Sequence, residues 1–207
     1  MDVTFFFRGL LIGLSIAAPV GPIGVLCIRR TLAEGRAAGL VSGLGAATAD
    51  ALYGFIAAFG LTFISGFLID QQTWLRLVGG LFLLYLGIKT LLAKPAGPAQ
   101  PSPAGGRGLL AAYTSTFFLT LTNPITILFF AGIFSGLGAA GAGGSYASAA
   151  ILVAGVFAGS ALWWLTLSGL VSLFRARFDA RALRWVNRLS GVVIVGFGLA
   201  ALFSLKG

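Results

Sequence analysis

The sequence predicts an all-α integral membrane protein, with six transmembrane helices arranged as two inverted three-helix repeats. Its 207 residues are 58% hydrophobic and only 9% charged, whereas a soluble domain carries about a quarter charged residues. A bilayer-spanning helix needs about 20 predominantly apolar residues. Apolar runs of about this length or longer cover residues 5–28, 38–68, 74–92, 108–135, 146–173 and 185–205. The third observation is an internal repeat, described below.

The first run is expected to be a retained span rather than a signal peptide. It continues to Ile28, which is too long for the roughly 7–15 apolar residues of a signal sequence. Proline removes a backbone donor and clashes with the preceding helical turn. We therefore expect this span to be broken at Pro19 and Pro22, and the fourth to be broken at Pro124.

The basic residues lie mainly between the apolar runs, where they indicate topology rather than nucleic-acid binding. By the positive-inside rule, the loops rich in Lys and Arg are cytoplasmic. Both termini are then outside, as in a multi-pass protein of a bacterial-type plasma (inner) membrane. One side holds most of the 14 basic residues, namely Arg29, Arg30, Arg36, Lys89, Lys94, Arg107, Arg175, Arg177, Arg181, Arg184 and Arg188.

The internal repeat relates residues 1–92 to residues 108–207, on either side of a Pro/Gly-rich linker at 93–107. Three spans in each half make the second half enter the membrane in the opposite sense. Matching residues recur at an offset of 110 or 111, in the pairs Asp50 and Ser160, Trp74 and Trp185, Gly80 and Gly191, and Gly87 and Gly198. Inverted repeats with corresponding helix breaks are typical of secondary transporters.

The two breaks supply the candidate substrate-binding residues. A break frees backbone groups that are costly in lipid but can bind a polar solute when they line a cavity. The alternatives are a packing kink at the first break and a capping role for the asparagine at the second. The candidate residues are Pro19, Gly21 and Pro22 at the first break, with Asn123 and Pro124 at the second.

Asp50 is the one acidic residue placed deep in a predicted span. An ionisable residue inside a membrane is costly and by default marks a proton relay, an ion pathway or a substrate site. We expect Asp50 to couple transport to protons or to bind a substrate ammonium group. The alternative is a structural role, with Tyr53, Thr48 or an arginine of the first basic loop as its partner.

The composition excludes several classes of chemistry. The chain has no His, five acidic residues and a single Cys, so it lacks the residues for a disulfide or a Cys-x-x-Cys redox pair. We therefore expect no enzyme activity, no metal and no cofactor. Gly-x-x-x-Gly spacings at 9–13, 39–43 and 155–159 let helices approach closely, either within the chain or at the face of a homodimer.

Three segments resemble the LysE/RhtB family of amino-acid exporters: GPIGVLCIRRTLAEGRAAG (21–39), GAATADALYG (45–54) and TLTNPITILFF (120–130). The resemblance extends over nearly the whole chain and implies export of amino acids or similar small metabolites from the cytoplasm, driven by the proton-motive force. The matching positions are Gly21, Pro22, Gly35, Asp50, Asn123 and Pro124. Many members carry a compact Pro-Gly-Pro where this chain has Pro19-Val20-Gly21-Pro22.

The sequence leaves two other functions open. An inorganic cation transporter or channel could use Asp50 together with backbone carbonyls. A membrane scaffold or an enzyme subunit is the third reading, which the repeat and the paired breaks disfavour. The expected partners are a small amino-acid-like substrate and the lipid bilayer.

Overall fold

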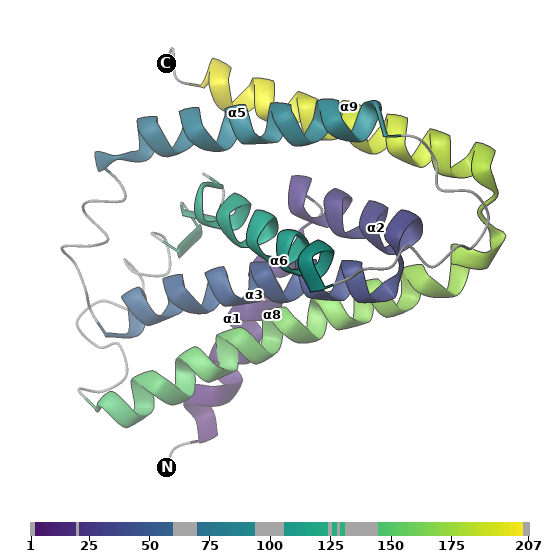
Figure 1. The fold of residues 1–207 in the computed structure, drawn as a ribbon. Helices are drawn as coiled ribbons and strands as arrows, with labels where there is room; N and C mark the ends of the chain where they lie inside the picture. Colours follow the sequence, from purple (N-terminus) through teal and green to yellow (C-terminus); the bar gives the residue numbers. More distant parts are fainter. Residues whose placement is uncertain are drawn as a thin grey trace.

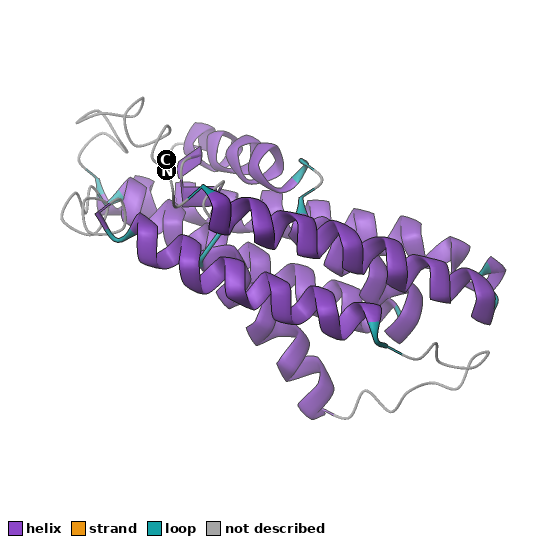
Figure 2. Ribbon diagram, turned by 90° about the horizontal axis from the view of Figure 1, so that it is seen from above, coloured by secondary structure: helices purple, strands orange, loops and turns teal. Residues whose placement is uncertain are grey.

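The structure is a computed structural model that describes residues 3–19, 21–59, 70–93, 106–123, 126–127, 129–130 and 145–204. The regular elements in these ranges are all helical (Figure 1, Figure 2), which confirms the predicted all-α class. In chain order they are α1 (Val3–Ala17), α2 (Pro22–Glu34), α3 (Arg36–Ala58), α5 (Gln72–Leu91), α6 (Gly106–Leu121), α8 (Tyr146–Phe174), the short 3₁₀ helix η2 (Arg175–Arg177) and α9 (Ala180–Phe203).

Four of the described helices are long and apolar enough to cross a membrane alone, in α3, α5, α8 and α9. A fifth candidate span is the pair formed by α1 and α2, which are bent by 80° relative to each other. The fourth predicted span is represented by α6, whose apolar part, Gly108–Leu121, is shorter than a full span. Most of its expected continuation to residue 135 lies outside the described residues. The structure thus supports four to five of the six predicted spans.

The first basic loop was expected to contain Arg29, Arg30 and Arg36. The structure instead places these residues in helices, so their placement in a loop was wrong. α2 continues through Arg29 and Arg30 to Glu34, and α3 begins at Arg36. Gly35 alone makes the turn, with a φ of 108°, a backbone conformation that glycine adopts without steric cost. Both arginines of α2 find polar partners on other parts of the packed protein, as described below.

Close helix packing depends on glycine where α1 crosses α8. A Cβ atom on Gly9 or Gly13 would lie 2.1 Å from a backbone oxygen of α8, and one on Gly159 would lie 2.1 Å from a backbone oxygen of α1. Gly39 faces Thr31 of α2, and Gly43 faces Trp164 of α8. All three Gly-x-x-x-Gly motifs therefore serve packing within the chain, and they give no argument for a homodimer.

α5 and α9 form a second close pair, which runs side by side in Figure 1. A Cβ atom added to Gly80 would contact the backbone oxygen of Gly198, and one added to Gly87 would contact that of Gly191. α3 packs against both α6 and α8, and α2 is held between α3, α8 and α9. Glycines at the α5–α9, α3–α6 and α3–α8 contacts let the backbones approach closely.

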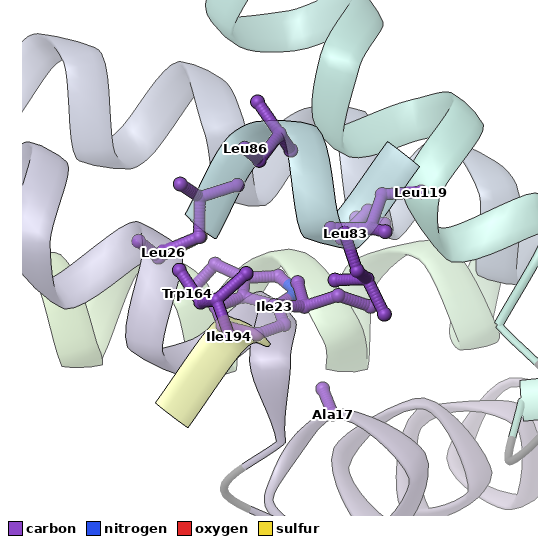
Figure 3. Packing of buried hydrophobic residues seen from close by; sticks show 11 residues of the cluster. Ala17, Ile23, Leu26, Leu83, Leu86, Leu119, Trp164 and Ile194 are labelled. Carbon is purple, nitrogen blue, oxygen red and sulfur yellow. The ribbon is translucent and has the colours of Figure 1, made fainter. Parts of the chain in front are cut away.

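The core has a cluster in which side chains from seven helices meet. Figure 3 shows its larger members around the first half of α2. We call it the α2 cluster, and its buried residues are Ala17, Ile23, Leu26, Cys27, Ala46, Ala47, Leu83, Leu86, Leu119, Trp164 and Ile194. A second cluster, around Tyr53 and Phe130, packs α3 against α8 and the segment that follows α6.

Candidate functional site

A cavity of about 150 Å³ lies where the first helix break meets the end of α6, and we call it the Asp50 cavity. A single water requires roughly 10–15 Å³ of such space, so the cavity has room for a small solute. Its walls include five of the six residues that the sequence singled out, which are Pro19, Gly21, Pro22, Asp50 and Asn123. The sixth, Pro124, lies outside the described residues.

The first break exposes the start of α2 to this cavity. α1 ends at Ala17, and α2 begins with Pro22 at its first position, preceded by Gly21 as an N-cap without a side-chain hydrogen bond. The first intrahelical bond that uses this cap runs from the N–H of Val25 to the carbonyl of Gly21, at 3.1 Å. The preceding N–H groups have no partner within the helix. Such a helix start favours an anionic group.

Asn123 forms the opposite wall, immediately after the last turn of α6. Its N–H donates to the carbonyl of Thr120 at 3.2 Å, and its own carbonyl accepts from the N–H of Ile127 at 3.1 Å. Thr120 and Thr126 also line the cavity. Sequence reasoning missed both threonines, although their position on either side of an Asn-Pro pair was a usable signal. The half-buried Asn123 thus lies among hydroxyl groups.

Asp50 comes from the middle of α3 and is only 3% exposed. Its carboxylate accepts a hydrogen bond of 2.7 Å from the hydroxyl of Ser160, on α8. The same Ser160 oxygen accepts from Nε1 of Trp164 at 3.2 Å. Trp164 both belongs to the α2 cluster and lines the cavity.

The partners suggested by sequence proximity bind elsewhere. The hydroxyl of Tyr53 donates to the carbonyl of Leu121 at 2.6 Å, at the end of α6. Thr48 donates to the carbonyl of Leu44 at 2.9 Å, within its own helix. The partner of Asp50 is instead Ser160, the residue that the predicted repeat aligns with Asp50.

A larger cavity, of about 860 Å³, lies beside the second half of α2, and we call it the basic cavity. Arg29, Arg30, Glu34 and Lys89 line it, together with apolar side chains of α5. Arg29 donates through Nε to Asn187 of α9 at 3.1 Å. It also forms an ion pair of 3.2 Å with Glu34.

Arg30 is buried in a network of neutral acceptors. Its Nη1 donates to the hydroxyls of Ser42 and Thr116, each at 2.8 Å, and to the carbonyl of Ala112 at 3.0 Å. Its Nη2 donates to the hydroxyl of Ser115 at 2.8 Å. The side chain thereby joins α2 to α3 and α6. Within the described residues, no group of three or more His, Cys, Asp or Glu is placed to hold a metal ion.

Comparisons with known proteins agree with the resemblance seen in the motifs. The model of the LysE type translocator family matches residues 14–205. A Bacillus subtilis protein named "Putative amino acid efflux protein YcgF" is 31% identical over 199 residues, covering 95% of this chain and 94% of the relative. The threonine efflux protein of Salmonella typhimurium is 23% identical over 219 residues, covering 99% of this chain and 100% of the relative.

A further relative, the Escherichia coli membrane protein YahN, is 29% identical over 182 residues, which cover 85% of this chain and 79% of the relative. No solved structure matches the chain significantly. The family match spans most of the sequence, and four of the described helices have the length and composition of membrane spans. The chain therefore belongs to the LysE type translocator family, and it is a transmembrane transporter rather than an enzyme.

Proposed function

We propose that the protein is a secondary active exporter of amino acids or related small metabolites, coupled to protons, in a bacterial-type plasma membrane. The observation that carries the proposal is the Asp50 cavity, where the first helix break, the end of α6 and a buried carboxyl group line one space. The names of two relatives, an amino acid efflux protein and a threonine efflux protein, support the same substrate class.

In this proposal the Asp50 cavity binds a zwitterion by its carboxylate at one end and its ammonium group at the other. Pro19, Gly21 and Pro22 present the start of α2, which attracts the substrate carboxylate. Asn123 forms a polar wall at the second proposed break, and Pro124, which lies outside the described residues, is proposed as the residue that breaks the helix there. Asp50 accepts either the substrate ammonium group or a proton, so that binding of one displaces the other. Because substrate and proton exchange at this single carboxyl group, they move across the membrane in opposite directions.

We further propose that the two halves, residues 1–92 and 108–207, are inverted repeats joined by the linker at 93–107. The glycine contacts support a two-fold relation, because a two-fold interface is reciprocal. Gly80 meets Gly198 and Gly87 meets Gly191, while the sequence pairs Gly80 with Gly191 and Gly87 with Gly198. The hydrogen bond between Asp50 and Ser160 joins two corresponding residues, as expected near such an axis.

The proposed orientation puts both termini outside and the basic ends of the helices in the cytoplasm. A cysteine introduced at the exposed Ser145, before α8, tests it in a chain whose buried Cys27 remains unlabelled. A membrane-impermeant maleimide added outside intact cells should label Ser145→Cys. Labelling only after the cytoplasm is opened would reverse the proposed topology.

The function itself is tested by export of a panel of amino acids from cells that overproduce the protein, with and without a protonophore. At least one amino acid should leave faster than in control cells, and the protonophore should abolish the difference. Asp50→Asn keeps an oxygen that can accept from Ser160, so it should insert normally and fail to export. Asp70→Asn, at an exposed acid, should export normally.

The same cells distinguish the alternative function. Failure of every amino acid to respond would contradict the proposal. An ion-dependent current through the purified protein in a planar bilayer, combined with that failure, would instead identify an inorganic cation pathway.

A further inference from the structure

We propose that the basic cavity is a second binding site, which takes the carboxylate of an amphiphilic solute before that solute reaches the Asp50 cavity. The inference rests on the proposed function for the direction of movement and for the class of solute. The chemistry of the cavity itself, a basic wall facing an apolar wall, comes from the contacts of its lining residues.

The fixed charge of the cavity is Arg30. Its side chain is 8% exposed, and its four hydrogen bonds go to three hydroxyls and one backbone carbonyl. Within the described residues no carboxylate lies within ion-pair distance of it, since the one ion pair found there joins Arg29 to Glu34. A buried cation without a counter-ion is unfavourable. The neutral network holds the guanidinium in place without neutralising it.

The neighbouring charges leave an excess of positive charge. Arg29, Arg30 and Lys89 line the cavity, against the single carboxylate of Glu34. Glu34 is engaged by Arg29 at 3.2 Å, and Lys89 lies on α5 across from the arginines, 5.7 Å from the ring centre of Tyr85. An anion entering the cavity would therefore be attracted from two sides, and arginine suits carboxylate recognition through its planar set of donors.

The remaining wall is apolar, and it indicates that the rest of the bound molecule, beside its anionic group, is apolar too. α5 contributes Phe82, Tyr85, Leu86 and Ile88 to the lining. A volume of about 860 Å³ is at the upper end of the roughly 300–1,000 Å³ that ligand sites occupy. A carboxylate with an aliphatic body satisfies both walls, whereas a small inorganic anion would leave the apolar wall unused.

α2 joins this site to the Asp50 cavity. Pro22, Ile23 and Gly24 line the Asp50 cavity, and Leu26, Arg29 and Arg30 line the basic cavity. At 1.5 Å per residue, the eight steps from Pro22 to Arg30 span about 12 Å. The α2 cluster contributes Ile23 and Trp164 to one wall and Leu26 and Leu86 to the other, so the cluster, whose members Ile23, Leu26, Leu86 and Trp164 are labelled in Figure 3, borders both cavities.

Binding to the purified full-length protein in an uncharged detergent tests the site. Two probes of matched shape are titrated by calorimetry: 4-methylpentanoate, which has the carboxylate but no amine, and 3-methylbutylamine, which has the amine but no carboxylate. Wild type should bind 4-methylpentanoate. Lys89→Gln and Arg30→Gln should each weaken that binding by about tenfold or more, as expected for loss of a charge-assisted contact, and should leave the amine probe unaffected.

Two controls keep the result specific. Arg184→Gln removes an exposed arginine that does not line the cavity, and it should bind 4-methylpentanoate like wild type. Lys89 is exposed, so its variant should fold normally even where Arg30→Gln loses the network that joins three helices. Unchanged affinity in Lys89→Gln and in folded Arg30→Gln would overturn the proposal, as would equal weakening by Arg184→Gln.

The anionic group could instead be a lipid phosphate, and a second arm separates the two sources. The titration is repeated in nanodiscs of phosphatidylcholine alone and of phosphatidylcholine with phosphatidylglycerol. Equal carboxylate affinity in both supports the solute site. Loss of carboxylate binding with phosphatidylglycerol, together with retention of that lipid by wild type but not by Lys89→Gln, would identify a lipid site and overturn the proposal. Absence of amino-acid export by wild type despite carboxylate binding would contradict only the proposed function.

Discussion

Replacing Gly155 by alanine should separate α1 from α8 and destabilise the protein. A Cβ atom at this position would lie 2.2 Å from the carbonyl oxygen of Phe6, 2.9 Å from the amide nitrogen of Leu10 and 3.0 Å from the Cα of Gly9. All three atoms belong to the backbone of α1, so no side chain can rotate away. The shortest distance is 1.2 Å below the 3.4 Å at which ordinary contact begins, and the helices must move apart to restore it.

The magnitude follows from the cost of overpacking. Forcing an extra carbon into a well-packed interface costs about 1–3 kcal/mol. The matched control is Gly169→Ala on the same helix, where an added Cβ meets nothing within 4 Å and alanine gains roughly 0.5–1 kcal/mol of helix preference. Gly155→Ala gains the same helix preference, so the two variants should differ by the overpacking cost of about 1–3 kcal/mol, which for a chain of this length corresponds to roughly 2–12 °C in the unfolding midpoint.

Thermal unfolding of the purified variants in one detergent measures this difference. Gly155→Ala should unfold below wild type, and Gly169→Ala at or slightly above it. Equal midpoints for the two variants would refute the close α1–α8 crossing, because the same chemical change would then cost the same with and without backbone atoms opposite.

Three further changes test other parts of the structure. Gly35→Ala places a side chain at a φ of 108° and should cost about 1 kcal/mol or more, visible as a lower unfolding midpoint; an unchanged midpoint would refute the one-residue turn. Tyr53→Phe removes the donor to the carbonyl of Leu121 and should cost about 1 kcal/mol, so equal stability to wild type would contradict that contact. Ser160→Ala removes the hydrogen bond to Asp50 and should lower export and stability together, by about 1–3 kcal/mol for the latter; full activity would show that this contact does not position the carboxyl group.

The sequence was sufficient for the fold class and for most of the spans. Composition and the length of the apolar runs are local properties, and a bilayer makes them decisive because each span must satisfy its own backbone hydrogen bonds. The break at Pro19 and Pro22 was equally readable, since proline acts on the turn that contains it. The structure places α1 and α2 on either side of that break, at 80°.

The contacts between distant segments could not be predicted from the sequence. The predicted repeat aligns Ser160 with Asp50, but only the packing of α3 on α8 shows that the two side chains touch. Arg30 was interpreted as a topology signal because its partners are 12 residues or more away in the chain, on α3 and α6. The basic cavity was missed for the same reason, since its walls come from segments that are distant in the sequence.

Proton movement in proteoliposomes is the most direct test of the central claim, that Asp50 couples amino-acid export to protons. The purified protein is reconstituted with a pH-sensitive dye inside the vesicles, and an amino acid that responds in the export assay is added to one side. Wild type should move protons only when the amino acid is present, in the direction opposite to it, and Asp50→Asn should move none although it inserts normally. Amino-acid transport by wild type without proton movement, or unchanged proton movement in Asp50→Asn, would contradict the account.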